Sequence, residues 1–545
     1  MKISIAQLNY HIGNFDGNIR QMVEAIEQAR QDGADLICFS ELATTGYPPR
    51  DFLDFEDFIE LSYEAVDQLK PHSDDLAIVV GSPRFNPVAE GKDLYNSALV
   101  IHQGEIVFTQ HKTLLPTYDI FDEYRYFEPA NRWSVFEYKG KKIAITICED
   151  IWNVGNANPM YTICPLDEMM ADEPDFIINI SASPFDYTSA RRRIEVVRAN
   201  VSRYKIPLFY VNHCGAQTEI LFDGGSLVMN QDGVMVDEFS YFTPALRTYD
   251  LDEVRKNAEN REQSKEKMEL IRRGLVMGIR DYFRKLGFTR AILGLSGGLD
   301  SALTCVLAVE ALGAENVRVL LMPGPYSTDH SISDARELAE NLSIQYEVVP
   351  ITKAYEAVVE NLNPVFANQQ FGLTEENIQA RLRGLFLMAV SNKSGEILLN
   401  TSNKSEAAVG YGTLYGDMAG GISVIGDLYK TEVFELARHL NRHEVIIPLN
   451  TIIKPPSAEL RPDQKDSDSL PEYAILDVIL YQYIERSQSP EDIIALGYDP
   501  VLVRRICRLV NINEFKRYQA APVLRVSRKA FGMGRRMPIV GKYLS

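Results

Sequence analysis

Short apolar runs recur along the first half of the chain, and amphipathic or polar stretches separate them. Runs of four to six residues rich in Ile, Val and Leu are typical of buried strands. The predicted strands are Ile3–Leu8, Leu36–Ser40, Ala77–Gly81, Ala98–Ile101, Ile143–Ile147, Phe176–Ile180 and Leu208–Asn212. Between the first two, Asn18–Gln31 carries Ile19, Val23 and Ile26 at helical spacing. Strands that alternate with helices predict a layered α/β domain.

The second half begins after a charged stretch and repeats the alternation. Residues 252–269 contain 11 charged side chains and no aromatic one, which predicts a solvated linker or an exposed helix start. We therefore expect two domains, residues 1–258 and 259–545. A helix around Ile271–Phe283 is followed by a βαβαβ series, which predicts a doubly wound parallel sheet. Its predicted elements are strands Ala291–Leu295, Val317–Leu321 and Tyr346–Pro350 and helices Ser301–Leu312 and Ser331–Asn341. The polar segment Ser457–Pro471 predicts a mobile loop.

Composition excludes several protein classes. Hydrophobic residues make up 46% and charged residues 24% of the 545, which is ordinary for globular domains. The net charge of −19 disfavours binding to nucleic acid or to an anionic membrane. There is no apolar run of membrane-spanning length, and Met1–Gln7 is too short for a signal peptide. The cysteines at 38, 148, 164, 214, 305 and 507 form neither a CxxC pair nor a zinc spacing, which favours a reducing cytoplasm.

The strongest chemical signal is a glycine-rich turn between a strand and a helix. The strand runs into Gly294-Leu295-Ser296-Gly297-Gly298-Leu299-Asp300-Ser301. Glycines let backbone N–H groups approach a ligand, and a helix N-terminus favours an anion. Asp300 is positioned to hold Mg²⁺ against phosphate oxygens. A bare glycine turn kept for packing is the alternative, and the full string argues against it; the GxxxxGK[ST] loop is absent.

This string resembles the pyrophosphate loop of the N-type ATP pyrophosphatases, whose members include NAD, GMP, asparagine and argininosuccinate synthetases and tRNA-thiolating enzymes. Downstream motifs are similar to those of the NAD synthetases. They are Asn377–Arg383, Asn400–Glu406, Gly410–Gly412, Tyr415–Asp417 and Gly426–Lys430. The resemblance implies ATP contacts by residues 294–301, Thr401 and Lys430, and Mg²⁺ contacts by Asp300 and Glu406. It also implies deamido-NAD contacts by Asn377, Glu406, Asp417 and Lys516. Taken singly, these acids suit a solvated surface, as Arg535 and Arg536 suit a solvated basic end.

Three residues of the first half lie at or near predicted strand ends, where α/β proteins present functional groups. They are Glu41, Lys112 and Cys148. Together they form an amide-cleaving set: a thiolate attacks, an ammonium lowers its pKa and stabilises the oxyanion, and a carboxylate transfers protons. The alternative for Cys148 is a small buried hydrophobic residue, which is the usual state of a lone cysteine.

These segments resemble the nitrilase superfamily, which has a Glu-Lys-Cys triad on a four-layer α-β-β-α sandwich. Cys148–Trp152 and Glu41–Tyr47 are similar to its glutaminase branch. The resemblance implies glutamine contacts by Tyr118 and Ser183, with Tyr47, Phe121 and Glu149 lining the pocket. Some relatives carry a basic residue where this chain has Ser189, so Arg191 or Arg192 is the substitute for holding the glutamine carboxylate.

The two halves are complementary, because the first would free ammonia and the second would consume it. Together they resemble the glutamine-dependent NAD synthetases. The resemblance implies glutamine, ATP and deamido-NAD as substrates, an adenylated intermediate, and a homo-oligomer of at least two chains. One rival is an amidotransferase for another acceptor, but residue 2 is Lys and no His is placed to assist Cys148. The other rival is a binding protein with an inactive triad, although all three triad residues are present.

Overall fold

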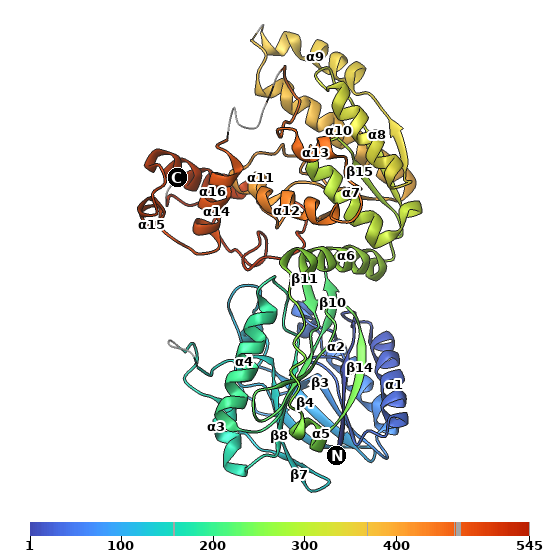
Figure 1. Cartoon of the computed structure of the whole chain (residues 1–545), viewed down its shortest axis with the longest axis vertical. Helices are drawn as coiled ribbons and strands as arrows, with labels where there is room; N and C mark the ends of the chain where they lie inside the picture. The colour runs from blue at the N-terminus through green and yellow to red at the C-terminus, as the bar shows by residue number, and fades with distance from the viewer. Residues whose placement is uncertain (156–158, 368, 463, 465–469, 544–545) are drawn as a thin grey trace. The chain divides into compact units, whose positions relative to one another are not determined.

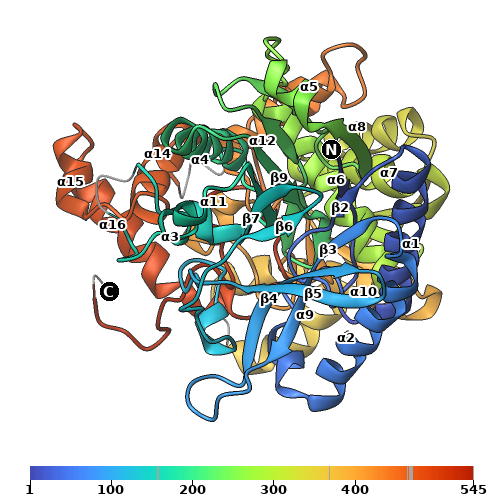
Figure 2. The same ribbon diagram turned by 90° about the horizontal axis from the view of Figure 1, so that it is seen from below.

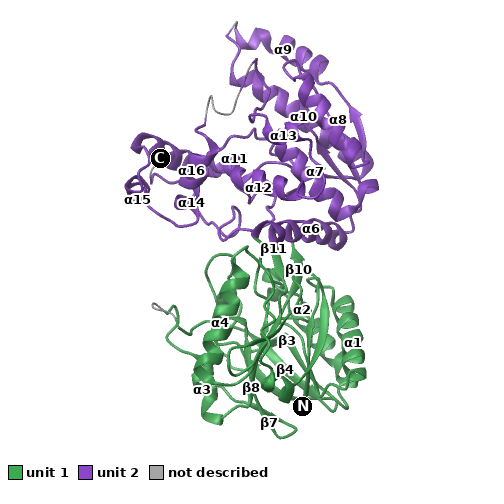
Figure 3. Ribbon diagram, in the orientation of Figure 1, with its two compact units in different colours: residues 1–266 green, residues 267–545 purple. Residues whose placement is uncertain are grey.

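The computed structural model describes residues 1–155, 159–367, 369–462, 464 and 470–543. The chain divides into two compact units, Met1–Glu266 and Lys267–Ser545 (Figure 3). The boundary between the units lies eight residues later than the expected one at residue 258. The reason is that the charged segment after residue 258 packs onto the first unit. The Arg261 amide bonds to the Met235 carbonyl at 2.9 Å, and the Lys265 ammonium lies 3.1 Å from the Glu238 carboxylate.

The first unit is built on two six-stranded sheets. One has the order β14-β1-β2-β3-β4-β5 and the other β13-β12-β9-β8-β7-β6. The strands of the first sheet are β1 (Lys2–Gln7), β2 (Leu36–Cys38), β3 (Ala77–Phe85), β4 (Leu94–His102), β5 (Glu105–His111) and β14 (Ala245–Asp250). Those of the second are β6 (Phe136–Tyr138), β7 (Lys141–Ile147), β8 (Phe176–Ser181), β9 (Leu208–Asn212), β12 (Leu227–Met229) and β13 (Met235–Glu238). All seven predicted strands are confirmed.

Helices cover the outer faces of these sheets. They are α1 (Phe15–Gln31), α2 (Glu56–Leu69), α3 (Pro165–Met169) and α4 (Ser189–Tyr204), with α5 (Leu251–Lys256) at the end of the unit. Figure 2 shows α1 and α2 on one side of the strands and α3 and α4 on the other. The inner faces meet in a core that includes Ile5, Val79, Ile145 and Ile178. This is the predicted four-layer α-β-β-α sandwich, and the short hairpin of β10 (Cys214–Gln217) and β11 (Ile220–Asp223) extends it.

The second unit contains a five-stranded parallel sheet of order β17-β16-β15-β18-β19. Its strands are β15 (Ala291–Gly294), β16 (Val317–Leu321), β17 (Gln345–Val348), β18 (Ile397–Asn400) and β19 (Ile422–Ser423). The chain moves outward in one direction from β15 and then returns to its other side with β18. This reversal is the topological switch point at which doubly wound sheets bind ligands. The predicted doubly wound sheet is confirmed.

Helices pack around this sheet and form a further lobe beyond it (Figure 1). Those nearest the sheet are α6 (Lys267–Leu286), α7 (Leu299–Leu312), α8 (Asp329–Asn341), α9 (Thr352–Phe366), α10 (Leu373–Ser394), α11 (Lys404–Val409), α12 (Lys430–Leu440) and α13 (Leu449–Ile453). The lobe contains α14 (Tyr473–Ile484), α15 (Pro490–Ala495), α16 (Pro500–Ile512) and α17 (Glu514–Arg517). Its core includes Leu476, Ile479, Val503 and Ile506.

Three further expectations concern loops and surfaces. In the predicted loop Ser457–Pro471 the described residues form neither helix nor strand, and residues 463 and 465–469 lie outside the described part. Arg535 was expected in solvent, but it is only 8% exposed because it bonds to the buried Glu514 carboxylate at 2.6 Å. Within the described residues, no helix has the length and apolar character needed to span a membrane.

Two candidate active sites

Glu41, Lys112 and Cys148 come together between the two sheets of the first unit. Glu41 follows β2 (Leu36–Cys38), Lys112 follows β5, and Cys148 follows β7. The Lys112 ammonium bonds to the Glu41 carboxylate at 2.7 Å, and both side chains are completely buried. The Glu41 carboxylate also accepts bonds from the Asn96 amide at 2.7 Å and the Ala182 N–H at 3.0 Å. A carboxylate so firmly held keeps one fixed orientation.

A glycine lets the segment that carries Glu41 pack closely on β3. A Cβ atom at Gly81 would lie 2.3 Å from the Leu42 nitrogen and 2.6 Å from the Ser40 carbonyl oxygen. Both are backbone atoms, which cannot move aside cheaply. Gly81 is therefore needed for the position of the Glu41 backbone.

Cys148 stands on a strained turn. Strand β7 ends at Ile147, and the short 3₁₀ helix Cys148–Ile151 begins at once. The φ angle of Cys148 is +43°, a conformation that costs of order 1–3 kcal/mol for a residue with a Cβ. The buried Asp150 carboxylate holds this turn against the end of β5, accepting N–H bonds from Ile147 at 3.1 Å and from Leu114 at 2.8 Å. Asp150 was not among the predicted site residues.

The electrostatics keep the Cys148 thiol neutral at rest. Burial raises its pKa well above the usual value, and the Glu41 charge raises it further. The ammonium of Lys112 lowers the thiol pKa as expected, but it does not outweigh those two effects. The effect of Lys112 has the expected direction, but the net pKa of the thiol is raised, so the thiol needs a base to take its proton as it reacts.

A second glutamate, which the sequence analysis missed, completes the environment of Lys112. Glu123 lies on the short 3₁₀ helix Glu123–Arg125, and its carboxylate is 2.7 Å from the Lys112 ammonium. It also accepts a 2.8 Å bond from the Tyr47 hydroxyl, so Tyr47 contacts the site through Glu123. Burial raises the pKa of Glu123 to about 7. Two carboxylates outweigh the burial of Lys112 and raise its pKa well above the usual value, which keeps it charged.

Glu149, next to the nucleophile candidate, is a buried carboxylate with aromatic hydroxyls for partners. The Tyr118 hydroxyl donates to it at 3.0 Å, and the Tyr161 hydroxyl donates at 3.1 Å. Phe121 packs edge-on against Tyr118, with ring centroids 5.4 Å apart. Burial raises the pKa of Glu149 above its usual value. Tyr118, Phe121 and Glu149 thus form one cluster with Tyr161, and their contact with glutamine stays a prediction.

The remaining glutamine candidates are held in local structure. The Ser183 N–H bonds to the Asn212 side-chain oxygen at 2.9 Å. The Ser189 hydroxyl bonds to the Asp186 carbonyl at 2.8 Å at the start of α4. Arg192 is paired with the Asp186 carboxylate, and Arg191 is exposed. Of the two arginines expected to hold the glutamine carboxylate, Arg192 is thus already ion-paired and Arg191 is exposed.

In the second unit, the glycine-rich turn joins β15 to α7 at the switch point. The Gly298 N–H bonds to the Ser296 hydroxyl at 3.2 Å, and the Ser296 and Ser301 hydroxyls are 3.0 Å apart. Gly297 has a φ angle of +81°, and a Cβ there would lie 2.2 Å from the Ser331 carbonyl oxygen. This close approach brings the first turn of α8 beside the first turn of α7. Two helix N-termini then face the same cavity, which favours anions.

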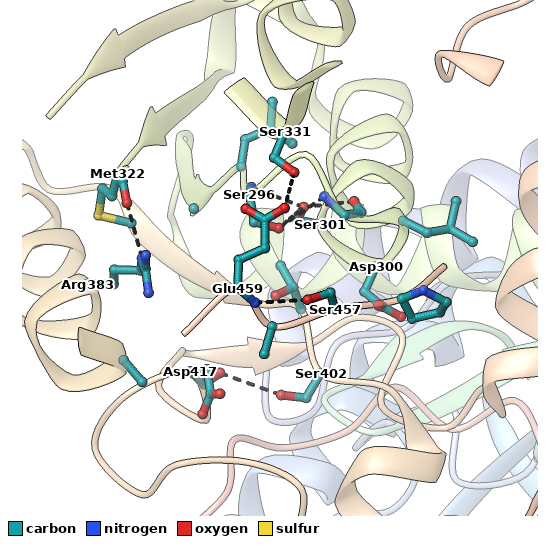
Figure 4. Close-up of a pocket in the computed structure, with 18 of the residues that line it drawn as sticks. Ser296, Asp300, Ser301, Met322, Ser331, Arg383, Ser402, Asp417, Ser457 and Glu459 are labelled. Atoms are coloured by element: carbon teal, nitrogen blue, oxygen red, sulfur yellow. Dashed lines mark hydrogen bonds between the residues drawn. The ribbon is translucent and has the colours of Figure 1, made fainter. Parts of the chain in front are cut away.

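That cavity has a volume of about 320 Å³, which suits a small-molecule ligand. Predicted residues that line it are Gly294, Leu295, Ser296, Gly298, Leu299, Asp300, Ser301, Thr401, Glu406, Asp417 and Lys430. Figure 4 shows Asp300, Ser301 and Asp417 around it. Asp300 pairs with the Lys430 ammonium and accepts a 3.0 Å bond from the Asn403 amide. Lys430 also lies 3.9 Å from the Glu406 carboxylate.

Three charged residues that line this cavity were not predicted: Arg383, Lys454 and Glu459. The Glu459 carboxylate accepts bonds from the Thr328 N–H at 3.1 Å and the Ser331 hydroxyl at 2.7 Å, at the N-terminus of α8. Arg383, on α10, donates from Nε to the Met322 carbonyl at 3.1 Å. Burial lowers the Arg383 pKa, although the charges of Glu459 and Asp417 oppose this.

Asn377 and Lys516 lie around one loop, residues 410–417, rather than on the cavity lining. The Asn377 side-chain oxygen accepts a 2.8 Å bond from the Thr413 hydroxyl, and the Thr413 N–H bonds to Asp417 at 2.6 Å. The Lys516 ammonium bonds to the carbonyls of Gly410 at 2.7 Å and Gly412 at 2.9 Å. Both side chains therefore support the loop that carries Asp417 into the cavity.

The carboxylates beside the glycine-rich turn suit a hard divalent cation. Within the described residues, no three His, Cys, Asp or Glu side chains form a metal-binding group. Mg²⁺, however, is usually bound by one or two carboxylates together with substrate phosphates. Asp300 and Glu406 both approach the Lys430 ammonium, so the two carboxylates already share one positively charged neighbour. Their oxygen donors fit Mg²⁺ better than a softer metal.

Comparisons with known proteins agree with both halves. The family model described as carbon-nitrogen hydrolase matches residues 2–258, and that described as NAD synthase matches residues 271–520. A glutamine-dependent NAD(+) synthetase from Synechocystis is 46% identical over 98% of both chains. One from Thermotoga maritima is 38% identical over 100% of this chain and 99% of its own. The structure of the Acinetobacter baumannii enzyme with adenosine diphosphate is 38% identical, has a TM-score of 0.78, and covers 99% of this chain and 98% of its own.

Proposed function

Because this chain belongs to the glutamine-dependent NAD(+) synthetase family, we propose that its first unit hydrolyses glutamine and its second uses the ammonia to make NAD. The observation that carries the proposal is the joint presence, in one chain, of a complete buried Glu41-Lys112-Cys148 set and an anion-binding cavity with Asp300 and Lys430. Neither alone specifies a synthetase that takes its nitrogen from glutamine.

In the first unit, Cys148 attacks the side-chain amide carbon of glutamine while Glu41 takes the thiol proton. The ammonium of Lys112 stabilises the oxyanion, because it is held beside Glu41 and stays charged. The C–N bond then breaks, ammonia leaves with a proton from Glu41, and a γ-glutamyl thioester remains. Water activated by Glu41 hydrolyses the thioester to glutamate.

Glutamine recognition falls to the Glu149 cluster and its surroundings. Within the described residues, Glu149 has no basic side chain within ion-pairing distance, and it is only 5% exposed. A buried carboxylate of this kind gains strongly from a cationic ligand. The α-ammonium of glutamine supplies that charge, with Tyr47, Tyr118, Phe121, Ser183 and Ser189 around the substrate.

In the second unit, the turn 294–301, Thr401 and Lys430 bind ATP, while Asn377, Glu406, Asp417 and Lys516 position deamido-NAD. A nicotinate carboxylate oxygen attacks the α-phosphorus of ATP, and pyrophosphate leaves. Ammonia then attacks the carbonyl carbon of the adenylate, AMP leaves, and the amide of NAD is formed. Mg²⁺ held by Asp300 and Glu406 would neutralise phosphate charge.

The proposal is tested with the purified chain, deamido-NAD, ATP, Mg²⁺ and glutamine. We expect NAD, AMP and glutamate to appear together in equal amounts, as separated by chromatography. Glutamate without NAD would retain the amidase assignment and reject deamido-NAD as the acceptor, and xanthosine monophosphate would then be tried.

Two further proposals are a homo-oligomer and a cytoplasmic location. Light scattering on the same sample tests the first, and cell fractionation tests the second.

A second experiment addresses Glu123. Glu123→Gln keeps the shape of the side chain but removes its charge from Lys112. We expect glutamine hydrolysis to slow by about ten- to a hundredfold, the worth of one hydrogen bond to a charged group. The control is Glu128→Gln, because Glu128 follows Glu123 by five residues and its carboxylate accepts a 2.9 Å bond from the Lys92 backbone N–H instead of one from Lys112. Equal glutamine kinetics in the two variants would remove Glu123 from the mechanism.

A further inference from the structure

A tyrosine that follows the Cys148 turn in the sequence contacts the residue directly after the cysteine. Glu149 lies on the turn Cys148–Ile151, and Tyr161 lies ten residues beyond that turn. The Tyr161 hydroxyl donates to the Glu149 carboxylate at 3.1 Å. Tyr161 is partly buried, and its hydroxyl has no other described partner than Glu149. This contact was not predicted from the sequence.

An asparagine next to the Cys148 turn holds the backbone at Tyr161. Asn153 comes directly after Trp152, the residue that ends the Cys148 turn. Its side-chain amide donates to the Tyr161 carbonyl at 2.9 Å and to the Ile163 carbonyl at 2.7 Å. One amide group thus ties the backbone of Tyr161, and that of the second residue after it, to the segment that carries Cys148 and Glu149. The tyrosine is held in place by the same short segment that holds the nucleophile.

The two tyrosines do not share Glu149 equally. Tyr118 donates to both carboxylate oxygens, at 3.0 Å to Oε1 and 3.1 Å to Oε2. Tyr161 donates only to Oε1. Each carboxylate oxygen can accept about two hydrogen bonds, so Oε1 is saturated and Oε2 retains an accepting position. Oε2 is therefore the oxygen of Glu149 that can accept a bond from a ligand.

We propose that Tyr161 is a positioning residue for glutamine recognition, which fixes the Glu149 carboxylate so that Oε2 meets the α-ammonium of the substrate. The proposal rests on the glutaminase function proposed above and deepens it. Tyr161 touches neither the triad nor the scissile amide, so its effect is on substrate binding and not on the chemical steps. Asn153 acts one step further out, because it holds Tyr161.

The test is the kinetics of Tyr161→Phe in the full-length protein. We expect the KM for glutamine to rise about tenfold, since one hydrogen bond to a charged group is lost, with kcat nearly unchanged. Asn153→Ala is expected to raise the same KM by a smaller factor. The control is Tyr249→Phe, which removes a hydroxyl that bonds to Asp237 at 2.6 Å elsewhere in the same unit. We expect wild-type kinetics from the control.

Glutaramic acid, which is glutamine without its α-amino group, separates positioning from a general loss of structure. A hydroxyl that acts through Glu149 on the ammonium matters little for this substrate. We therefore expect Tyr161→Phe to leave kcat/KM for glutaramic acid within about twofold of the wild-type value, well below the tenfold effect of a lost charged hydrogen bond. Equal losses with glutamine and glutaramic acid, or an unchanged KM for glutamine, would overturn the proposal.

Failure of the underlying function looks different. NAD synthesis driven by an ammonium salt reports on the second unit and should be unchanged in every variant. If the wild-type protein released no glutamate from glutamine, the glutaminase assignment itself would fail. If it hydrolysed glutamine normally and Tyr161→Phe did the same, only the role of Tyr161 would be rejected.

Discussion

Replacement of Cys148 by alanine is expected to abolish NAD formation from glutamine while NAD formation from an ammonium salt continues. The substitution removes one buried sulfur, so the second unit keeps its cavity and its substrates. Loss of a catalytic nucleophile typically costs more than about a thousandfold in rate, far beyond any effect of a small cavity. The measurement is NAD by chromatography, with each nitrogen source supplied in turn.

Cys164→Ala is the matched control for this prediction. Cys164 is a free cysteine in the same unit, it is partly exposed, and its sulfur lies 3.4 Å from the Tyr204 hydroxyl rather than beside an acid and a lysine. The Cys164→Ala variant should use glutamine at the wild-type rate. Loss of ammonium-driven synthesis in Cys148→Ala would show that Cys148 has a structural role. Loss of glutamine use in both variants would show that the effect is not specific to Cys148, and would contradict its assignment as the nucleophile.

Cys148 combines a strained backbone with a thiol that is neutral before it reacts. The φ angle of Cys148 is +43°, and its side chain is buried at the end of β7. The thiol stays protonated there because burial and Glu41 outweigh Lys112. In the proposed mechanism, Glu41 takes this proton as the sulfur attacks the bound substrate, so a thiolate does not form before the substrate binds.

Most strands in the interior of the first unit's two sheets were predicted, and the strands at the edges of those sheets were not. The runs that became β7, β8 and β9 are continuous and apolar, so their burial follows from composition. β5 (Glu105–His111) alternates exposed and half-buried side chains, and its Glu, Thr and Gln residues conceal it among loops. Pairing with β4 decides its state, and that pairing is a tertiary property.

The same distinction applies to the sites. Residues at the ends of apolar strands, such as Glu41 and Cys148, could be selected because strand ends present functional groups. Glu123 and Tyr161 lie on a short turn and on a loop, where no periodicity marks them. Their relevance comes from the carboxylate or ammonium that they contact across the fold. Acidic and aromatic residues in a loop are ordinary, so only the three-dimensional contact identifies them.

Asp300→Asn is expected to abolish NAD synthesis from both nitrogen sources while glutamine hydrolysis survives. Asp300 accepts bonds from Asn403 and pairs with Lys430, at the start of the helix that faces the cavity. An amide in its place cannot pair with Lys430 and is a poor ligand for Mg²⁺ beside phosphate. We expect a fall of at least about a hundredfold, because removing one member of a buried charge pair leaves the other uncompensated. NAD, AMP and pyrophosphate are measured together.

Asp329→Asn provides the comparison, because Asp329 lies in the first turn of the neighbouring helix α8, is exposed, and does not line the cavity. It shares the helix-terminal position of Asp300 without its partners, so a general effect of helix-terminal charge would appear in both variants. Ordinary turnover in Asp300→Asn would exclude it from the metal and phosphate site. Loss of glutaminase activity as well would mean that the first unit depends on the second for its activity. Loss of synthesis alone, with Asp329→Asn normal, ties the adenylation step to the cavity at the switch point of the sheet.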